Sequence, residues 1–194
     1  MPRPRAFDDT VALDACVDQF WDHGFHATST DDLCTRSGLS RSSLYNAFGK
    51  KREVYLRGVR RYGEVQGAVR EASVERTAHD SGRDALRAFL AEVLDQQWAD
   101  HDRRVCFGIH ACVDVDAGDD EIRDVLVGNA DQFRSVIAGL IARGQQDGSL
   151  QRRGDPTDLA AVVHVAIDGL QVASRVRSAR SDVDRTVDTL VGLL

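Results

Sequence analysis

The sequence predicts an all-α protein, and three observations predict it. Apolar residues recur at three- and four-residue spacings through most of the chain, the period of a helix with one buried face. Residues that cap helix starts and glycines that end helices stand at the borders of these segments. No segment shows the apolar–polar alternation of a half-buried strand. We therefore expect about nine helices: a three-helix head, a long fourth helix and a helical body.

The first two predicted helices have clear borders. The first spans residues 9–23 and ends at Gly24. Its buried face is predicted from apolar residues at helical spacing: Leu13, Cys16, Val17 and Phe20. Ser29, followed three residues later by Asp32, is a variant of the capping box. It predicts a short second helix from Thr30 to Ser37.

A tight turn separates the second helix from the third. Gly38 supplies the left-handed backbone that such a turn needs. Ser40 caps a third helix, Arg41 to Phe48, and Gly49 closes it. Two short helices joined by a glycine-containing turn predict a helix-turn-helix. Lys50 then opens the long fourth helix.

Five more helices are expected in the body, and periodicity and caps define them. One is capped by Ser81, and the others are predicted at residues 103–115, 119–148, 156–178 and 182–194. The helix at 156–178 is apolar on most sides, which predicts deep burial. The last helix carries one narrow apolar stripe.

Composition indicates a soluble globular protein. Hydrophobic residues make up 42% of the 194 residues and charged residues 29%. No apolar run approaches the roughly 20 residues of a membrane span, and no signal peptide is recognisable. We expect a cytoplasmic protein with no membrane partner. The four cysteines form no C-x-x-C pair, which argues against a zinc knuckle or a redox motif of that type.

The charge of the chain is unevenly distributed. The formal net charge is −6. Residues 33–61 nevertheless hold eight arginines and lysines and a single glutamate, whereas residues 1–32 hold seven aspartates and two arginines. A basic segment on an otherwise acidic protein is typical of a small DNA-reading head. The alternative is an ordinary solvated surface.

The predicted helix-turn-helix has the side chains that such a motif needs. Its apolar plug is predicted to consist of Leu33, Leu39, Leu44 and Phe48. Cys34 is small enough for the point where the two helices cross. The outer face of the third helix would carry Arg41, Ser42, Ser43 and Asn46. Polar side chains there suit a helix that enters the DNA major groove, which is about 12 Å wide.

From Phe7 to Tyr62 the sequence resembles the DNA-binding domain of the TetR family of transcriptional regulators. The resemblance is carried by Phe20, Gly24, Thr28-Ser29, Leu33, Gly38-Leu39-Ser40, Ser43-Leu44-Tyr45, Phe48, Lys51 and Val54. The run Leu44-Tyr45-x-x-Phe48-x-x-Lys51 after a glycine turn is the most specific part. Cys34 stands where alanine is usual, and it should pack equally well.

The resemblance implies roles for individual residues. Thr30, Tyr45 and Lys51 would contact DNA phosphates. Base edges would be read by Arg41, Ser42, Ser43 and Asn46, since arginine can read guanine, and asparagine adenine, with two hydrogen bonds. The alternatives are a packing role for Tyr45 and solvated charge for Arg41 and Lys51. Arg3 and Arg5 could form an arm that reaches the duplex.

The resemblance also implies an organisation for the whole chain. Residues 1–52 would be the DNA-binding domain, and residues 53–194 the ligand-binding and dimerisation domain. The protein would be a regulator, most readily a repressor, that binds a palindromic operator as a homodimer and is released by a small-molecule effector. The last two helices would form the dimer interface. Alternatively, their apolar stripes only close the core of one chain.

Five residues are candidates for lining the effector pocket: Trp98, Phe107, His110, Phe133 and His164. Plain core packing is the alternative for each. His110 with Asp114, and His164 with Asp168, are four residues apart on helices and so share a face. We interpret both as hydrogen-bonded pairs rather than metal ligands, and we expect no metal and no cofactor.

Three other functions can be weighed from the sequence. One is an interaction or architectural protein that binds DNA without an effector, which a body without a cavity would favour. A cysteine-based sensor of oxidants or electrophiles, of the same fold, would use Cys106, which follows Arg103-Arg104, or Cys112. A small buried cysteine is the alternative. The catalytic motifs G-x-S-x-G and H-E-x-x-H and a glycine-rich phosphate loop are missing, so we do not expect an enzyme.

Overall fold

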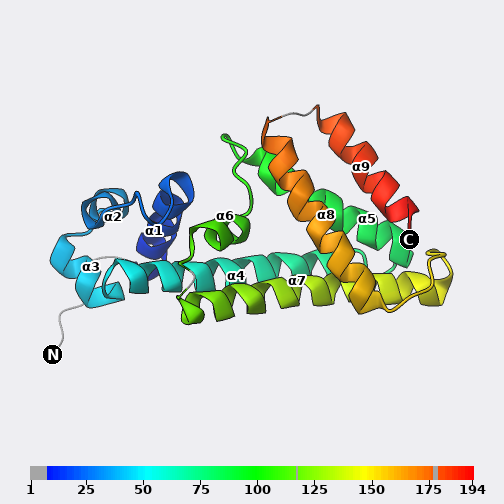
Figure 1. Ribbon diagram of the computed structural model, residues 1–194, viewed down its shortest axis with the longest axis horizontal. Coiled ribbons are helices and arrows are strands. Elements are labelled where there is room, and N and C mark those ends of the chain that lie inside the picture. The colour runs from blue at the N-terminus through cyan, green and yellow to red at the C-terminus, as the bar shows by residue number, and fades with distance from the viewer. Residues whose placement is uncertain (1–7, 117, 177–178) are drawn as a thin grey trace. The chain divides into compact units, whose positions relative to one another are not determined.

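The computed structural model describes residues 8–116, 118–176 and 179–194, and these form nine helices and no strand (Figure 1). The expected all-α fold is confirmed. The helices are α1 (Asp9–His23), α2 (Thr30–Ser37), α3 (Arg41–Phe48), α4 (Lys51–Arg76), α5 (Gly82–Ala99), α6 (Phe107–Asp114), α7 (Asp120–Asp147), α8 (Pro156–Val176) and α9 (Arg180–Gly192). Arg3 and Arg5, the predicted arm, lie outside the described residues.

The chain divides into two compact units. The first contains the head up to Val65 together with residues 107–127, and so includes α1, α2, α3 and α6. Its core is apolar and rich in aromatic rings. Tyr55 lies at its centre, with ring centroids 4.9 Å from Phe20, 4.9 Å from Phe25 and 5.9 Å from Phe107. Helix α6 is thus packed into the head through Phe107.

The second unit contains residues 66–106 and 128–194. Its core joins α5, α7, α8 and α9. Gly82, the first residue of α5, lies so close to α7 that an added Cβ would stand 2.1 Å from the backbone N of Gly144. Only a residue without a side chain allows this approach. The backbone N–H of Gly82 donates to Asp147 at 2.7 Å, which fixes the start of α5 on the end of α7.

Local sequence signals explain the borders of the head helices. The Ser29 hydroxyl accepts from the Asp32 N–H, and the Asp32 carboxylate accepts from the Ser29 N–H, which completes the capping box of α2. Hydrogen bonds from Ser29 hold the pKa of Asp32 below its usual value. Gly38 follows with φ 70°, in the left-handed region expected of the turn.

The predicted helix borders in the body differ from the structure by one or two residues at α7 and α9, and by four residues at the start of α6. The helix expected from Arg103 begins at Phe107 instead. Arg103 has φ 49°, which no helix accommodates. The side-chain amide of Gln97 donates to the carbonyl of Arg103, and the N–H of Cys106 donates to Gln171 Oε1. Hydrogen bonds to α5 and α8 therefore hold this segment in a non-helical form.

Helix α8 is less buried than its composition predicts. Four valines are exposed, and we call them the valine stripe: Val162, Val165, Val172 and Val176. The expectation of deep burial is wrong for the single chain. In α9, by contrast, Val183, Val187 and Val191 are buried in the core of the second unit. The apolar stripe of α9 thus closes the core of its own chain.

Candidate nucleic-acid interface

Helix α3 divides cleanly into an apolar and a polar face. Leu44 and Phe48 are buried in the core of the first unit. The exposed side chains are Arg41, Ser42, Tyr45 and Asn46, with Ser43 half-buried beside them. Tyr45 is 40% exposed. The residues that sequence analysis assigned to base and phosphate contacts on α3 therefore lie together on one solvent-facing surface, which we call the reading face.

The start of α3 is organised around the Ser40 hydroxyl. This oxygen accepts from the backbone N–H of Ser43 at 3.1 Å. It lies 3.0 Å from the Ser42 hydroxyl and 2.9 Å from the Ser43 hydroxyl. A hydroxyl has one donor and two acceptor positions, so both serines retain hydrogen-bonding capacity for a second partner. Thr30 is half-buried at the first position of α2.

An acidic residue that sequence analysis did not single out contacts the reading face. Asp31, in the first turn of α2, accepts a hydrogen bond from the Arg41 guanidinium at 2.7 Å. This contact raises the pKa of Arg41. The two residues are ten apart in sequence, and the turn between α2 and α3 brings them together. Crossing of the helices, rather than any periodicity, creates the pair.

Lys51 has an unexpected set of partners. Its ammonium group donates to the backbone carbonyls of Phe25 and Thr28, each at 2.9 Å, and lies 4.4 Å from the centroid of the Phe25 ring. Two of its three donor positions are thus used by the loop between α1 and α2. The structure shows Lys51 as a clamp on this loop, and its predicted phosphate contact stays a prediction.

The same loop is held from α6. The N–H of Phe25 donates to Oδ2 of Asp114 at 2.6 Å, and His26 Nε2 lies 3.1 Å from the Asp114 carbonyl. Gly24 has φ 82°, and a Cβ there would lie 2.9 Å from the Asp114 carboxylate. The loop that leads into α2 is therefore fixed by α4 through Lys51 and by α6 through Asp114.

Much of the basic segment is neutralised by local ion pairs. The pairs are Arg36–Asp22, Arg41–Asp31, Arg52–Asp119, Arg52–Glu121, Arg60–Glu121 and Arg61–Asp14. Within the described part of the chain, Lys50 and Arg57 have no such partner. The surface of the head is accordingly less positive than the count of arginines and lysines indicates.

Comparison with protein families matches both parts of the chain. A model described as bacterial regulatory proteins, tetR family, matches residues 12–57. A second, described as a tetracyclin repressor-like C-terminal domain, matches residues 82–190. The chain belongs to the TetR family. It is a DNA-binding transcriptional regulator, and its reading face lies within the matched head.

Individual relatives are also similar to this TetR-family chain over most of its length. The uncharacterized HTH-type transcriptional regulator YezE of Bacillus subtilis is 24% identical over 188 residues, covering 97% of this chain and 95% of the relative. The HTH-type transcriptional repressor ComR of Escherichia coli is 26% identical over 173 residues, with 89% and 82% covered.

Solved structures resemble this TetR chain closely. The regulator CifR, a cysteine mutant in complex with a 26-base-pair operator DNA, superposes with a TM-score of 0.83 at 26% identity, over 97% of this chain and 98% of CifR. The reduced form of NemR from E. coli has the same fold, with a TM-score of 0.80 at 14% identity over 94% of this chain and 95% of NemR.

The five residues predicted to line an effector pocket are divided between the two units of this TetR-family protein. Phe107 and His110 belong to the first, where Phe107 is fully buried in the core and His110 Nδ1 lies 3.6 Å from Asp114. Trp98, Phe133 and His164 belong to the second. The rings of Phe133 and His164 are in contact, with centroids 4.9 Å apart.

His164 also contacts Asp168, with His164 Nε2 3.3 Å from the Asp168 carboxylate. Burial lowers the pKa of His164 and raises that of Asp168, so both groups are shifted toward their neutral forms. The guanidinium of Arg70 lies 4.9 Å from the Phe133 ring centroid. Among the described residues no group of three or more His, Cys, Asp or Glu side chains is arranged to hold a metal.

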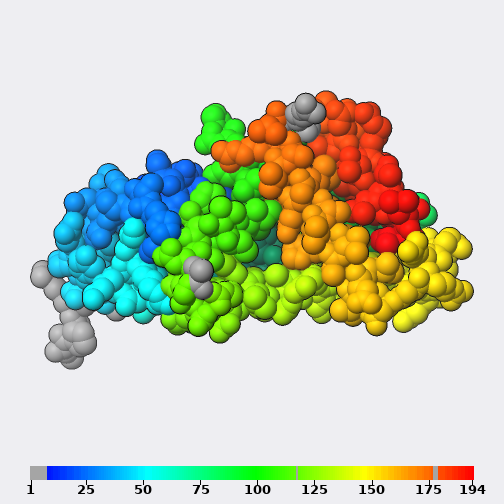
Figure 2. Space-filling model, in the orientation of Figure 1, coloured from blue at the N-terminus to red at the C-terminus, as the bar shows by residue number. Residues whose placement is uncertain are grey.

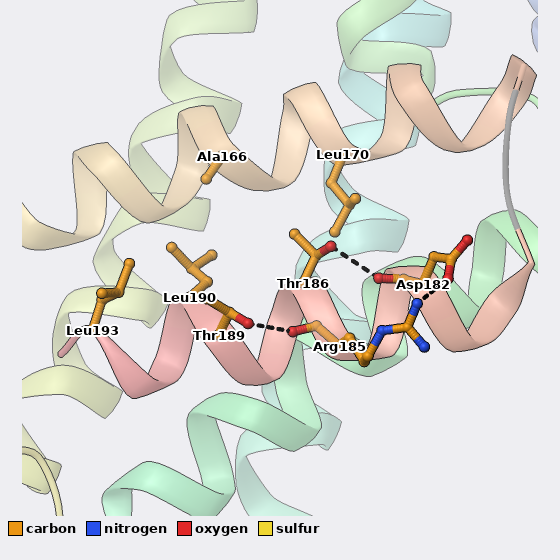
Figure 3. A pocket seen from close by; sticks show the side chains of 8 residues that line it. All are labelled: Ala166, Leu170, Asp182, Arg185, Thr186, Thr189, Leu190 and Leu193. Atoms are coloured by element: carbon orange, nitrogen blue, oxygen red, sulfur yellow. Dashed lines mark hydrogen bonds and ion pairs between the residues drawn. The ribbon is translucent and has the colours of Figure 1, made fainter.

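A groove of about 530 Å³ lies along the exposed sides of α8 and α9 (Figure 3). Its lining residues are Ala166, Leu170, Asp182, Arg185, Thr186, Thr189, Leu190 and Leu193. None of the five pocket candidates is among them. In Figure 2 the surfaces of α8 and α9 lie next to each other and are open on this side. The groove adjoins the valine stripe, so the two helices share an uncovered, partly apolar surface.

Helix α8 is also long and apolar enough to cross a membrane by length and composition, with a mean hydropathy of 1.4 over 18 residues. A helix that packs against a partner protein passes the same test. Val163 and Ile167 of this helix are buried in the core of the second unit, so α8 is packed into the helical body along one side.

Proposed function

We propose that this chain is a repressor that binds a palindromic operator as a homodimer in the cytoplasm and is released by a small-molecule effector. It has no catalytic role in this proposal. The observation that carries it is the reading face of α3: polar side chains, exposed together, on the second helix of a helix-turn-helix. The operator complex of the similar CifR chain supports it.

Phosphate contacts would position this head on DNA, and base contacts would give it specificity. We assign phosphate contacts to Thr30, Tyr45 and Lys51, with Lys51 using the donor position that the loop carbonyls leave. Base contacts are assigned to Arg41, Ser42, Ser43 and Asn46. The functional division that we propose is a DNA-binding domain at residues 1–52 and a ligand-binding and dimerisation domain at residues 53–194.

The dimer interface would be built mainly by α8. The valine stripe and Gly169 repeat at alternating three- and four-residue spacings along this helix. That is the spacing of a helix that packs against another helix. A twofold interface brings the same surface of both chains together, so one stripe serves both chains. Leu193, which follows the end of α9 and is also exposed, would extend the interface.

The effector would bind in the second unit, near the Phe133–His164 contact. This contact brings an aromatic ring, a polar imidazole and, through Arg70, a positive charge into one place. A ligand that binds there would act only if it favours one of two states of the protein. Trp98 remains a candidate in the same unit. Phe107 and His110 belong to the first unit, and this proposal does not include them.

The cysteine-based alternative depends on an activated thiol at Cys106. In the structure, Arg104 is paired with Asp100 at 2.9 Å, and the Arg103 guanidinium lies 3.9 Å from the Trp98 ring centroid. Both arginines therefore have partners other than the thiol. Mass spectrometry after mild peroxide treatment tests the alternative. Oxidised Cys106 with loss of operator binding would support it, and an unmodified Cys106 would contradict it.

Selection from a random-sequence DNA pool at a stated salt concentration tests the main proposal. We expect enrichment of a palindrome, because two heads related by a twofold axis read two equivalent half-sites. Tyr45→Ala serves as the control and should retain little DNA. If neither protein enriches any sequence, the operator-binding proposal is wrong for the unliganded chain. The selected operator then becomes the probe for finding effectors by release.

A further inference from the structure

Asp31 is an acidic side chain on the surface that faces DNA in the proposed function. It is 78% exposed, and its partner Arg41 is 57% exposed. A single nitrogen, Nη2, of the Arg41 guanidinium donates to Asp31. A guanidinium has five N–H donors in a rigid plane. The contact with Asp31 therefore holds one edge of that plane and leaves donors available to a second partner.

Fold stability does not explain the pair. An exposed ion pair contributes little to stability. Helix α2 is already capped by the box between Ser29 and Asp32, so Asp31 is not needed for that purpose. A carboxylate that faces phosphates also weakens non-specific DNA binding. A carboxylate in the first turn of α2 favours the helix dipole, but this small gain does not require a contact with Arg41. The pairing itself, and its cost for DNA affinity, therefore need another explanation.

The pair can instead improve discrimination between bases, through the orientation of Arg41. Guanine is read by two parallel hydrogen bonds to its O6 and N7 atoms, which requires the guanidinium plane to be in line with the base edge. A free arginine loses side-chain entropy when it is fixed in this way. A carboxylate that already holds one nitrogen reduces this loss, because the planar fork is oriented before DNA arrives.

We propose that Asp31 is a specificity-determining positioning residue, which acts through Arg41 and favours guanine at one position of each half-site. This inference rests on the proposed function, since it needs the reading face to lie in the major groove. It commits to Arg41 as the group that touches the base and to Asp31 as the group that orients it. Loss of Asp31 should lower discrimination between bases without lowering affinity for non-specific DNA.

The test uses full-length protein and the operator selected above, with single-base-pair variants at each half-site position. Dissociation constants are measured by fluorescence anisotropy at one salt concentration. The proteins are the wild type, Asp31→Ala, Arg41→Ala and the double variant. Asp22→Ala is the matched control, because it removes the carboxylate that pairs with Arg36 at 3.1 Å and changes the net charge equally.

In the wild type, replacing the guanine read by Arg41 should weaken binding about 5- to 150-fold, the range for one bidentate contact. Asp31→Ala should reduce this penalty at least about threefold, the effect expected from the ordering of one long side chain, while binding to non-specific DNA stays the same or becomes tighter. Arg41→Ala should abolish the penalty, and adding Asp31→Ala to it should change nothing further. Asp22→Ala should keep the wild-type penalty at every position.

Two results would overturn the inference while leaving the proposed function intact. One is an Asp31→Ala protein with the same penalty as the wild type at every position. The other is a change of preference on adding Asp31→Ala to Arg41→Ala, because Asp31 would then read a base itself, as a carboxylate can read cytosine. A wild type that discriminates at no position would instead refute the proposed function.

Discussion

Lys51 shows how one side chain can serve the fold of the head. Its ammonium group satisfies two carbonyls of the loop that leads into α2, those of Phe25 and Thr28. Helix α2 in turn carries Asp31, the partner of Arg41. The position of the reading face therefore depends on a contact made by the first residue of α4. Lys51 should affect stability as well as DNA binding.

We predict that Lys51→Met lowers the free energy of unfolding by about 1–3 kcal/mol, because two partly buried carbonyls lose a charged donor. Chemical denaturation followed by circular dichroism measures this change. Lys50→Met is the matched control; Lys50 is exposed, and its loss should change stability by less than about 0.5 kcal/mol. Equal stability of the two variants would show that the clamp contributes nothing in solution.

Tyr45 and Asn46 are adjacent on the reading face but should behave differently. Tyr45→Phe removes a hydroxyl proposed to bind phosphate, so binding should weaken about tenfold or more on every DNA sequence. Asn46→Ala should change the preferred sequence at one position, because asparagine reads adenine. Anisotropy titrations with operator variants measure both effects. An unchanged preference in Asn46→Ala would remove its base-reading role.

At the residue scale, the sequence predicts which side chains are exposed better than it predicts their hydrogen-bond partners. The helical period predicts the exposed side of α3, the reading face, once Leu44 and Phe48 are assigned to the core. The partners of Lys51 do not follow, because they are carbonyls 23 and 26 residues away, in a loop without periodicity. The pairing of Asp31 with Arg41 needs the angle of the α2–α3 turn, which no single spacing encodes.

At the scale of elements, helix borders are predictable where the signal is local. Ser29 and Ser40 begin α2 and α3 as expected, because each side chain caps an amide within three residues of itself. The start of α6 at Phe107 is not predictable in this way. It depends on Gln97 and Gln171, which belong to two other helices and bind the preceding segment.

The close approach of α5 to α7 leads to a prediction about these two elements. Gly82→Ala should destabilise the second unit by about 1–3 kcal/mol, because its Cβ would overlap the backbone of Gly144. Gly139→Ala is the control: it lies within α7, and nothing stands within 4 Å of its added Cβ. It should stabilise by about 0.5–1 kcal/mol, since alanine favours helix over glycine. Chemical denaturation measures the stability of both variants. A Gly82→Ala protein as stable as the wild type would show that Gly82 and Gly144 are not in such close contact.

At the scale of the whole molecule, periodicity cannot distinguish a chain's own core from its partner's surface. The sequence of α8 is apolar on most sides. That pattern is compatible with burial in the chain's own core and with burial against a partner chain. In the structure Val163 and Ile167 are buried in the core, whereas Val165 is 73% exposed. Helix α9 has the opposite outcome, because its valines all face its own core. Most of the proposed dimer surface therefore comes from one helix.

The valine stripe gives a direct test of assembly. The double substitution Val165→Glu with Val172→Glu should produce a monomer, because a twofold interface would bury four unpaired carboxylates, and each costs several kcal/mol to desolvate. The monomer should keep its own stability within about 0.5 kcal/mol, since both valines are exposed in the single chain. Light scattering coupled to size-exclusion chromatography measures the mass.

Operator binding should follow the loss of the dimer. Two linked heads bind two half-sites with a gain of about 10²- to 10⁴-fold over one head, so the monomer should lose affinity by at least about a hundredfold. Val127→Glu is the control, because Val127 is 49% exposed on α7, outside α8 and α9. It should remain a dimer with full affinity. If the double variant is still a dimer, the interface does not lie on α8. If the double variant is a monomer that binds the operator with wild-type affinity, operator binding does not require the dimer.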